Sequence, residues 1–375
     1  LDETGAIARS WTYAGLLESI TPLVAALQSL AAPGERVVLA FEGGPDSVEC
    51  FWASLVAGLV PVPAPAPERR LGARGWERLQ AIAQDAQAVL GVFPQGEGDA
   101  LPAPASARWI SSTALRALAQ SASRLETVPL QAEPQAPAYL QYTSGSTTAP
   151  RGVVLTHLQV LAHSRALGAR LAQRVSEVRI LSWLPWFHDY GLVQGLIQPL
   201  YMGVPGFLMP RSAFLRRPLR WLEALAQYRI TVSGAPDFAY AACAAERLRR
   251  PQWRADLTPW QLAVCGAEPV RARTMGDFNA AFADCGFDPA AWAPAYGLAE
   301  AVLTVSLPPR RGAPRLETVS RSALEQGWVR KPGVGSLDVQ ALVSCGSPID
   351  SVQLRVVDPH SGSPLPEGQI GELWL

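Results

Sequence analysis

The sequence has almost no lysine and no excess of charge of either sign. Lys331 is the only lysine in 375 residues, and the 32 basic residues balance 32 acidic ones. A lysine nucleophile elsewhere in the chain is therefore excluded. Without a net field, the chain as a whole attracts neither nucleic acid nor an anionic membrane, so its partners have to be recognised locally.

Cysteine and long apolar runs are also scarce. The five cysteines are scattered and none is spaced as C-x-x-C, which argues against a disulfide framework or a structural zinc site. No apolar run reaches the ~18 residues of a membrane span, and no charged-then-apolar leader follows Leu1. We expect a cytoplasmic protein without a membrane span, and a chain cut from a longer one.

What is present is a pattern typical of α/β proteins. Apolar residues make up 49% of the chain, and short β-rich runs alternate with amphipathic segments, as in 37–41 with 46–59 and 262–265 with 270–282. This alternation predicts mainly parallel sheets with helices on both faces, and ligands collect at the carboxyl ends of such strands. Residues 61–67 are rich in proline and predict a surface connector. Short antiparallel strands are expected after residue 352.

A loop between two predicted strands carries many hydrogen-bond donors. Residues 143–152 hold five hydroxyl side chains, two glycines and an arginine. Glycines let main-chain N–H groups point into one concavity, and arginine adds a fixed positive fork, which suits a polyanion. The spacing is not that of P-loop NTPases, and a solvated turn is the alternative. The predicted contacts are Thr143, Ser144, Gly145, Ser146, Thr147, Thr148, Arg151 and Gly152.

Two further segments predict a substrate tunnel. His188 lies beside Asp189 among bulky apolar residues at a strand end, where it can hold a carboxylate or phosphate oxygen. The alternative is a satisfied structural pair. In the segment 231–240, Gly234 leaves volume that Phe238 can line, although ordinary core aromatics explain this segment better when it is taken alone. The predicted tunnel residues are Trp183, Phe187, Asp189, Gly191, Leu192, Gly234 and Phe238.

Two more strand ends predict a slot for a flat ring. Tyr296 followed by glycine gives a stacking surface with close main-chain access, which suits a purine, and Glu300 can hold a hard cation such as Mg²⁺. A tight turn at 266–269 gives a second wall. The predicted nucleotide contacts are Gly266, Ala267, Glu268, Tyr296, Gly297 and Leu298.

With these segments in this order, the chain resembles the adenylate-forming superfamily of acyl-CoA synthetases, luciferases and peptide-synthetase adenylation domains. It is most similar to the fatty acyl-AMP ligases, through residues 181–192 and 236–240 and an insertion at about 307–343. The resemblance implies the large domain of that fold. Two layered, interleaved αβ subdomains with mainly parallel sheets would occupy 1–350, and a small distorted β-barrel would begin in 351–375.

The resemblance also implies an activity. A fatty acid would be activated by ATP to acyl-adenylate with release of pyrophosphate, and then transferred to the phosphopantetheine of an acyl carrier protein. His188, Glu300 and Arg151 would be catalytic, and Glu300 with Thr143 would hold Mg²⁺. Arg151 stands where many members carry lysine, but it keeps the charge.

The family's small C-terminal domain with its catalytic lysine would lie beyond Leu375, so slow adenylation is expected from this chain alone. An acyl-CoA synthetase using free CoA is one alternative. Another is an amino-acid adenylation domain, for which Asp189 is the only candidate to bind the amino group, and a third is a non-catalytic binding module.

Overall fold

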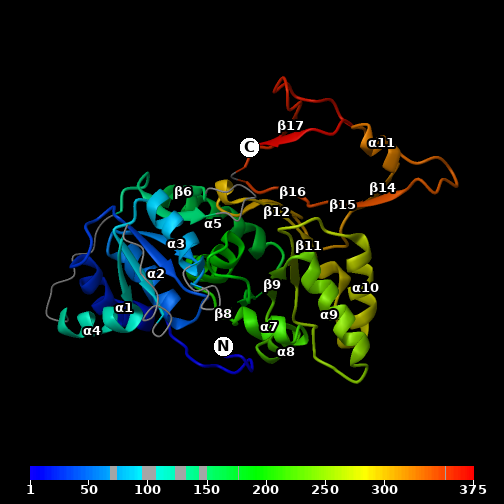
Figure 1. Cartoon of the computed structure of the whole chain (residues 1–375). Coiled ribbons are helices and arrows are strands. Elements are labelled where there is room, and N and C mark those ends of the chain that lie inside the picture. Colours follow the sequence, from blue (N-terminus) through cyan, green and yellow to red (C-terminus); the bar gives the residue numbers. More distant parts are fainter. Residues whose placement is uncertain (68–73, 95–106, 123–131, 143–149, 176, 351) are drawn as a thin grey trace. The chain divides into compact units, whose positions relative to one another are not determined.

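The computed structural model describes the chain except residues 68–73, 95–106, 123–131, 143–149, 176 and 351 (Figure 1). The described residues form two compact units, each assembled from separated stretches of chain. Unit 1 contains Leu1–Arg165, Ser182–Ala213 and Leu298–Leu303, and unit 2 contains Ala166–Leu181, Phe214–Gly297 and Thr304–Leu375. Both units contain a parallel sheet with helices, which confirms the α/β class.

Unit 1 is built on a parallel sheet in the order β2-β1-β3-β4. The strands are β1 (Arg36–Ala40), β2 (Val60–Ala64), β3 (Leu90–Phe93) and β4 (Arg108–Ser111). The helices are α1 (Tyr13–Gln28), α2 (Pro45–Val56), α3 (Arg74–Asp85) and α4 (Ser112–Ala122). Helix α1 packs against both α2 and α4.

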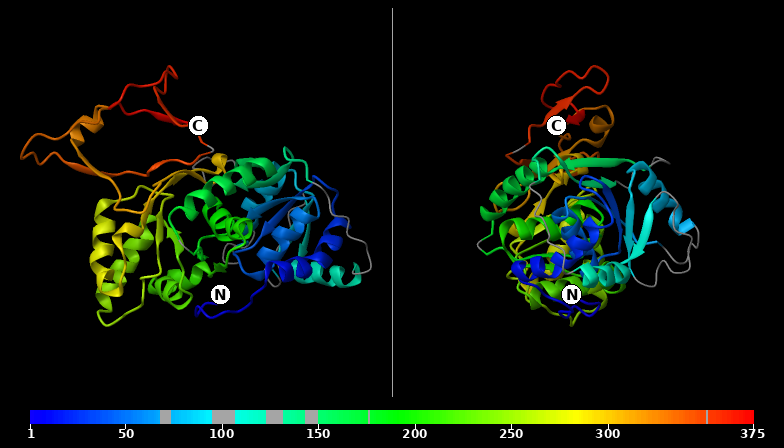
Figure 2. Two further views of the ribbon diagram at one scale, coloured as in Figure 1. Left: turned by 180° about the vertical axis from the view of Figure 1, so that it is seen from behind. Right: turned by 90° about the vertical axis from the view of Figure 1, so that its left-hand side faces the viewer.

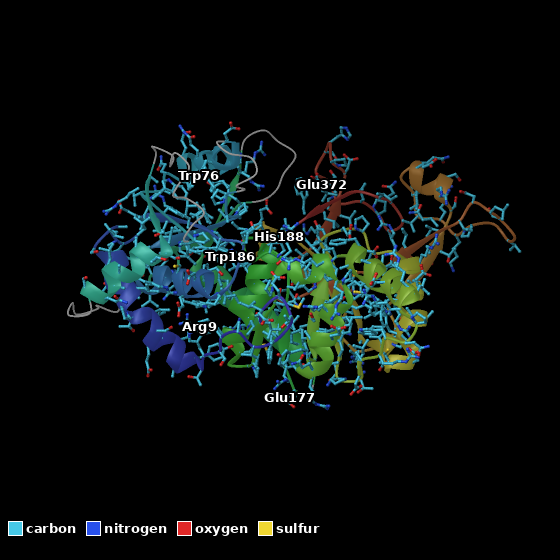
Figure 3. All side chains as sticks on the ribbon, turned by 60° about the horizontal axis from the view of Figure 1, so that its bottom comes forward. Arg9, Trp76, Glu177, Trp186, His188 and Glu372 are labelled. Atoms are coloured by element: carbon cyan, nitrogen blue, oxygen red, sulfur yellow. The ribbon has the colours of Figure 1, made fainter. Side chains whose placement is uncertain are left out.

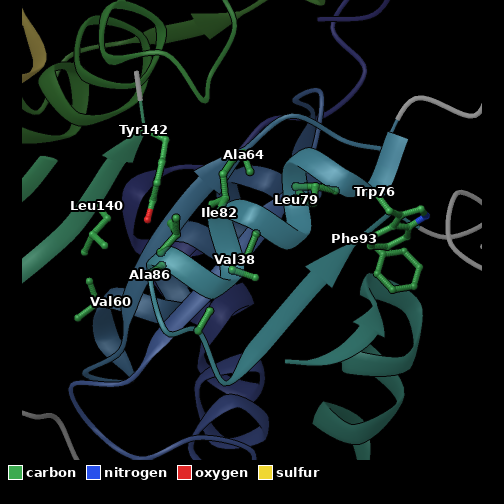
Figure 4. Packing of buried hydrophobic residues seen from close by; sticks show 14 residues of the cluster. Val38, Val60, Ala64, Trp76, Leu79, Ile82, Ala86, Phe93, Leu140 and Tyr142 are labelled. Atoms are coloured by element: carbon green, nitrogen blue, oxygen red, sulfur yellow. The ribbon is translucent and has the colours of Figure 1, made fainter. Parts of the chain in front are cut away.

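Helix α3 covers this sheet through one apolar stripe, shown in Figure 4. Trp76, Leu79, Ile82 and Ala86 recur every three or four residues, so they share one helix face, and all four are buried. The Trp76 ring meets the edge of Trp109 with 5.1 Å between ring centroids. Burial of each large side chain contributes about 1.5–3 kcal/mol, so this stripe is what holds α3 in place.

Strand β2 contradicts the expected surface connector at 61–67. Residues Val60–Ala64 are all buried and pair in register with β1. The Val60 N–H donates to the Glu35 carbonyl oxygen at 2.9 Å, so the even-numbered residues face β1. Pro61 and Pro63 therefore face away from β1, where the ladder requires no N–H group. Proline at alternate positions of an outermost strand is compatible with a sheet.

The rest of unit 1 follows the predicted strand pair. β5 (Pro137–Tyr142) pairs antiparallel with β6 (Gly152–Thr156), and α5 (His157–Ala172) begins directly after β6. The later elements are the π-helix η2 (Tyr190–Ile197), α6 (Gln198–Met202), β8 (Gly206–Leu208), α7 (Arg211–Arg216), which continues into unit 2, and the 3₁₀ helix η5 (Ala299–Ala301). The two strands predicted on either side of the hydroxyl-rich loop are thus confirmed.

Unit 2 is built on parallel strands that follow the order β11-β10-β9-β7. These are β7 (Ile180–Ser182), β9 (Val232–Ala235), β10 (Leu262–Cys265) and β11 (Trp292–Pro294), with α8 (Leu219–Gln227), α9 (Asp237–Arg249) and α10 (Ala272–Phe282). Helices α9 and α10 lie side by side in Figures 1 and 2. Tyr240 is fully buried among tryptophan and phenylalanine rings and donates its hydroxyl to the Val264 carbonyl oxygen, so it is a core residue.

The predicted insertion contains a hairpin. β14 (Leu316–Val319) pairs antiparallel with β15 (Gln340–Val343), and α11 (Arg321–Glu325) lies between them in sequence. The buried guanidinium groups of Arg170 and Arg174 bind main-chain oxygens at both ends of this region, and burial beside other arginines lowers the pKa of Arg174 to about 10. The acceptors beside the insertion are the oxygens of Leu307, Pro308 and Pro348, and Arg174 also binds the oxygen of Trp292 in β11.

The remaining strands of unit 2 are antiparallel. β12 (Tyr296–Gly297), β13 (Thr304–Leu307) and β16 (Ser347–Pro348) form one sheet, and β17 (Arg355–Val357) pairs with β18 (Glu372–Trp374). The antiparallel strands expected after residue 352 are therefore present, but the described residues form no closed barrel. Within the described ranges, no helix is both long and apolar enough to cross a membrane.

Candidate functional site

Both ends of the hydroxyl-rich loop are anchored in unit 1. Tyr142 and Gly152 are paired in register across β5 and β6, and a Cβ on Gly152 would lie 2.8 Å from Cζ of Tyr142. The Tyr142 hydroxyl donates to Asp85 at 2.6 Å, and burial together with this carboxylate raises the pKa of Tyr142. Arg151 is exposed beside this anchor. The predicted contacts Thr143 to Thr148 lie outside the described residues.

His188 is held by its neighbour and stays half-exposed. Its Nδ1 lies 2.5 Å from Oδ1 of Asp189, and the side chains are 47% and 12% exposed. The Tyr190 N–H also donates to this Oδ1 at 2.6 Å. The hydrogen bond and charge of Asp189 outweigh burial and raise the pKa of His188. The buried carboxylate therefore orients an imidazole whose outer edge is open to a ligand.

Two hydrogen bonds from side chains to main-chain oxygens fix the loop that carries His188, and Figure 3 labels Trp186 and His188 on this loop. The buried Gln141 of β5 donates from Nε2 to the Phe187 carbonyl oxygen at 2.7 Å, and Trp186 donates from Nε1 to the Phe41 oxygen at 2.6 Å. Sequence reasoning missed Gln141. A buried amide within an otherwise apolar strand is the signal that could have identified it.

A π-helix follows His188. The sequence predicts an amphipathic helical segment at 191–200, but not its π-helical form. All eight residues of η2 are buried. A Cβ on Gly191 would lie 2.1 Å from the Pro185 carbonyl oxygen, and one on Gly195 would lie 2.8 Å from Cβ of Ser182. The predicted tunnel residue Gly191 is thus where two stretches of main chain touch, while Trp183 and Leu192 are buried side chains of unit 1. π-Helical turns occur frequently at functional sites.

Glu300 lies on a strained turn of unit 1. It belongs to η5, and Val302 follows with φ +69° and ψ −52°, a rare conformation for a β-branched residue. The Leu298 N–H donates to the Leu303 carbonyl oxygen at 2.9 Å and closes the turn. The Glu300 carboxylate is exposed and has no hydrogen bond or ion pair to the described residues, so it is available to a hard cation.

The other predicted residues lie at the carboxyl ends of neighbouring strands of unit 2. Ala235 of β9 pairs with Cys265 of β10, which pairs with Pro294 of β11. The predicted residues beside these ends are Gly234, Phe238, Gly266, Ala267, Glu268, Tyr296 and Gly297. A common sheet edge therefore brings the two walls of the predicted purine slot together, as the parallel topology requires.

The geometry of this edge suits a flat ligand. A Cβ on Gly266 would lie 2.9 Å from the Ala295 carbonyl oxygen, so the main chains approach closely there. Tyr296 is 38% exposed and Phe238 is 48% exposed, which leaves both rings accessible. Ala267 has φ +67°, in the left-handed region. Because its side chain is this exposed, Phe238 is not an ordinary core aromatic.

Each of the two compact units carries some of the predicted site residues. Unit 1 carries Arg151, Gly152, Trp183, Phe187, His188, Asp189, Gly191, Leu192, Leu298 and Glu300, and unit 2 carries Gly234, Phe238, Gly266, Ala267, Glu268, Tyr296 and Gly297. Within unit 2, sequence reasoning missed Asp237, which is 1% exposed. A carboxylate directly before two apolar residues at a helix start is the only local signal for it.

The chain matches known proteins over almost its whole length. A family model for AMP-binding enzymes covers residues 4–375. A medium-chain-fatty-acid–acyl-carrier-protein ligase of Moorena producens is 36% identical over 98% of this chain and 63% of its own length. A long-chain-fatty-acid–AMP ligase of Mycolicibacterium smegmatis is 34% identical over 100% and 60%. The chain thus spans less than two thirds of the length of these relatives.

Solved structures agree with the fold. A fatty acyl-adenylate ligase from Legionella pneumophila, crystallised with acyl adenylate and pyrophosphate, aligns with 98% of this chain and 63% of its own at a TM-score of 0.88 and 31% identity. The adenylation domain of a keto acid-selecting peptide-synthetase module aligns at 0.82 and 24% identity, over 96% and 68% of the two chains, and supports the fold alone. These findings confirm the predicted resemblance and the adenylate-forming fold, and the chain belongs to the family of AMP-binding enzymes.

Proposed function

We propose that the protein activates a fatty acid with ATP and passes the acyl group to the phosphopantetheine thiol of an acyl carrier protein. A carboxylate oxygen bonds to the α-phosphorus, the bond from that phosphorus to the bridging oxygen breaks, and pyrophosphate leaves with the electron pair. The thiolate then attacks the acyl carbonyl carbon and AMP leaves. The observation that carries the proposal is the alignment with the ligase crystallised with acyl adenylate and pyrophosphate.

The residues of unit 1 act on the reacting groups. His188, oriented by Asp189, binds the fatty-acid carboxylate through its outer nitrogen and aims an oxygen at phosphorus. Arg151 neutralises charge on the triphosphate from beside the loop. Glu300, whose carboxylate is exposed, would hold Mg²⁺. Bound Mg²⁺ would neutralise charge on the phosphate oxygens as pyrophosphate separates.

The residues of unit 2 position the nucleotide and the acyl chain. Tyr296 offers an accessible ring face to adenine, and the close main-chain approach at Gly266 forms the facing wall. Phe238 provides an exposed apolar surface beside the buried Gly234 for the acyl chain. These residues of unit 2 work by positioning alone, because none of their side chains is required to accept a proton.

A carrier-bound thiol is proposed as the acceptor in place of free CoA. The similarity to the Moorena producens relative, a ligase of medium-chain fatty acids to acyl-carrier-protein, supports this choice. So does the hairpin of β14 and β15 within the predicted insertion. We also propose a cytoplasmic location, which is supported by five free cysteines.

Pyrophosphate exchange and mass spectrometry test the reaction. Purified full-length protein is incubated with ATP, labelled pyrophosphate and either saturated fatty acids of 8 to 16 carbons or the standard amino acids. Exchange is expected with fatty acids only, and exchange driven by an amino acid would reject the proposal. Intact-mass spectra with CoA and with phosphopantetheinylated carrier protein then identify the acceptor, and acyl-CoA as the sole product would favour an acyl-CoA synthetase.

A matched pair of tyrosine variants tests the nucleotide site. Tyr296→Ala is expected to weaken ATP binding about tenfold in calorimetry, because a stacking ring contributes roughly 1–1.5 kcal/mol. Tyr201→Ala removes a tyrosine of similar exposure, 40%, outside the predicted site and should leave ATP binding unchanged. Equal ATP affinity of both variants would show that Tyr296 does not stack on the base.

A further inference from the structure

Two carboxylates, one from each segment, link the start of α9 to the stretch between the end of β10 and the start of α10. Asp237 accepts from the Arg271 N–H through Oδ1 at 2.9 Å, and from the Arg271 guanidinium and the Thr274 hydroxyl through Oδ2 at 2.9 and 2.8 Å. In return, Glu268 accepts the Phe238 N–H through Oε1 at 2.7 Å. The segments are linked twice, from opposite directions, and both links lie within unit 2.

The buried carboxylate of Asp237 holds the start of α10 in place. Asp237 is 1% exposed, and it accepts three hydrogen bonds from Arg271 and Thr274. A buried carboxylate without donors is costly, so this stretch cannot move away without leaving the charge unpaired. Arg271 is the N-cap of α10, and the turn at 266–270 is suspended between it and the end of β10.

The turn at 266–270 has a strained main-chain conformation that contacts outside the turn have to maintain. Ala267 has φ +67°, which costs an L-residue about 1–2 kcal/mol relative to ordinary backbone. Gly266 lies against the Ala295 carbonyl oxygen. Relaxation of Ala267 would rotate the main chain that forms the wall of the purine slot, so something outside the turn has to hold it.

We propose that Asp237 and Glu268 are positioning residues that hold the turn at Gly266 and Ala267 in the shape that receives adenine. Glu268 acts through the Phe238 main chain and does not read the base with its carboxylate. Because Phe238 also borders the proposed acyl surface, the same bond connects the nucleotide side of unit 2 to the acyl side. This inference rests on the proposed function.

Substitutions of Glu268 test the proposal with two nucleotides, ATP and purine riboside triphosphate, which lacks the exocyclic amino group. Glu268→Ala is expected to weaken both about tenfold, because the turn loses its link to α9. Glu268→Gln keeps an oxygen that accepts the Phe238 N–H and should retain most of the affinity for both. If Glu268→Ala weakens ATP alone, the carboxylate contacts the amino group directly and the proposal is wrong.

The role of Asp237 is tested with two variants, of which the second is the milder. Asp237→Ala removes the anchor of α10 and is expected to weaken both nucleotides, but it can also unfold unit 2. Thr274→Val removes only one of the three bonds, so it should fold and weaken both nucleotides about threefold. Unchanged nucleotide affinity in Thr274→Val and Glu268→Ala, with wild-type unfolding midpoints, would refute the proposal.

A control and the wild type separate the possible failures. Asp277→Ala removes a carboxylate of α10 that is 63% exposed, and it should change neither nucleotide affinity nor unfolding. If wild-type protein binds neither ATP nor an acyl-sulfamoyl-adenosine analogue, the proposed function itself fails. If the wild type binds both and the Glu268 and Thr274 variants bind equally well, only the positioning role fails.

Discussion

A single added methyl group at Gly191 provides a direct test of how the His188 region is built. The first residues of η2 lie against the loop between β7 and His188, and a Cβ on Gly191 would be 2.1 Å from the Pro185 carbonyl oxygen and 2.9 Å from that of Leu184. Both neighbours are main chain, so no side-chain rotation relieves the contact. Gly191→Ala must therefore move one main-chain segment by more than an ångström or unwind the start of the π-helix.

The expected cost follows from overpacking. Inserting a methyl group into a well-packed interior costs about 1–3 kcal/mol, and the upper end applies where main chain has to move. Alanine is otherwise better than glycine in a helix by about 1 kcal/mol, which works in the opposite direction. We expect Gly191→Ala to lower the free energy of unfolding by about 2 kcal/mol, and to weaken fatty-acid binding because the main chain beside His188 shifts.

Gly276→Ala is the matched control. Gly276 lies inside α10, is exposed and has no atom within 4 Å of the position that a Cβ would take. Its alanine variant should therefore gain up to about 1 kcal/mol from helix propensity. Urea unfolding followed by tryptophan fluorescence measures both variants. If Gly191→Ala is as stable as Gly276→Ala, the close contact with Pro185 does not exist and the reasoning is refuted.

Three other substitutions probe charges. Asp189 raises the pKa of His188, so the stability that the pair contributes is fully present below about pH 6.5 and is lost as the pH rises through the pKa of the folded state. Asp189→Asn should lower the pKa of His188 in an NMR titration. An unchanged titration would contradict the pairing. Glu49→Gln leaves Arg116 without its fully buried partner and should cost about 2 kcal/mol in urea unfolding. Arg174→Met leaves two main-chain oxygens without their guanidinium donor and should lower the free energy of unfolding by about 1–3 kcal/mol. It should also accelerate tryptic cleavage within 310–331, and an unchanged digest would contradict this expectation.

Local patterns predicted most elements but not those set by distant contacts. The strand expected at 262–265 is β10, and the amphipathic segment expected at 270–282 is the helix α10, which begins two residues later. The expected connector at 61–67 is instead β2, because the outermost position lets alternating prolines face away from the ladder. A helical segment was expected at 191–200, but its π-helical form was not, because all residues of η2 are buried and no polar face marks the period.

The candidate site was predictable as a set of strand ends but not as a set of contacts. Parallel topology alone brings Gly266 and the residues after β9 and β11 to one edge of unit 2. The bonds that shape this edge join partners far apart in sequence, such as Asp237 with Thr274, and no local pattern reports them. Side chains that bind a ligand have a recognisable chemistry, whereas those that hold such side chains in place resemble ordinary core residues.

Backbone strain provides an observation that the sequence patterns did not use. Among the described residues, four other than glycine have φ between +48° and +69°. Gln87 and Arg229 each follow a helix, where a left-handed residue is ordinary and its hydrogen bonds close the helix end. Ala267 and Val302 do not follow such an end of an α-helix. The first lies in the predicted adenine wall and the second lies two residues after Glu300.

Each of these two conformations costs about 1–3 kcal/mol, and glycine at either position would avoid most of the cost. A chain that keeps alanine and valine there must hold the strain through its surroundings, as Asp237 and Glu268 do around Ala267. Strain of this kind concentrates where a site has to be shaped before its ligand arrives. Residue chemistry and main-chain conformation are separate observations, and both single out the predicted nucleotide segments at Ala267 and at Glu300.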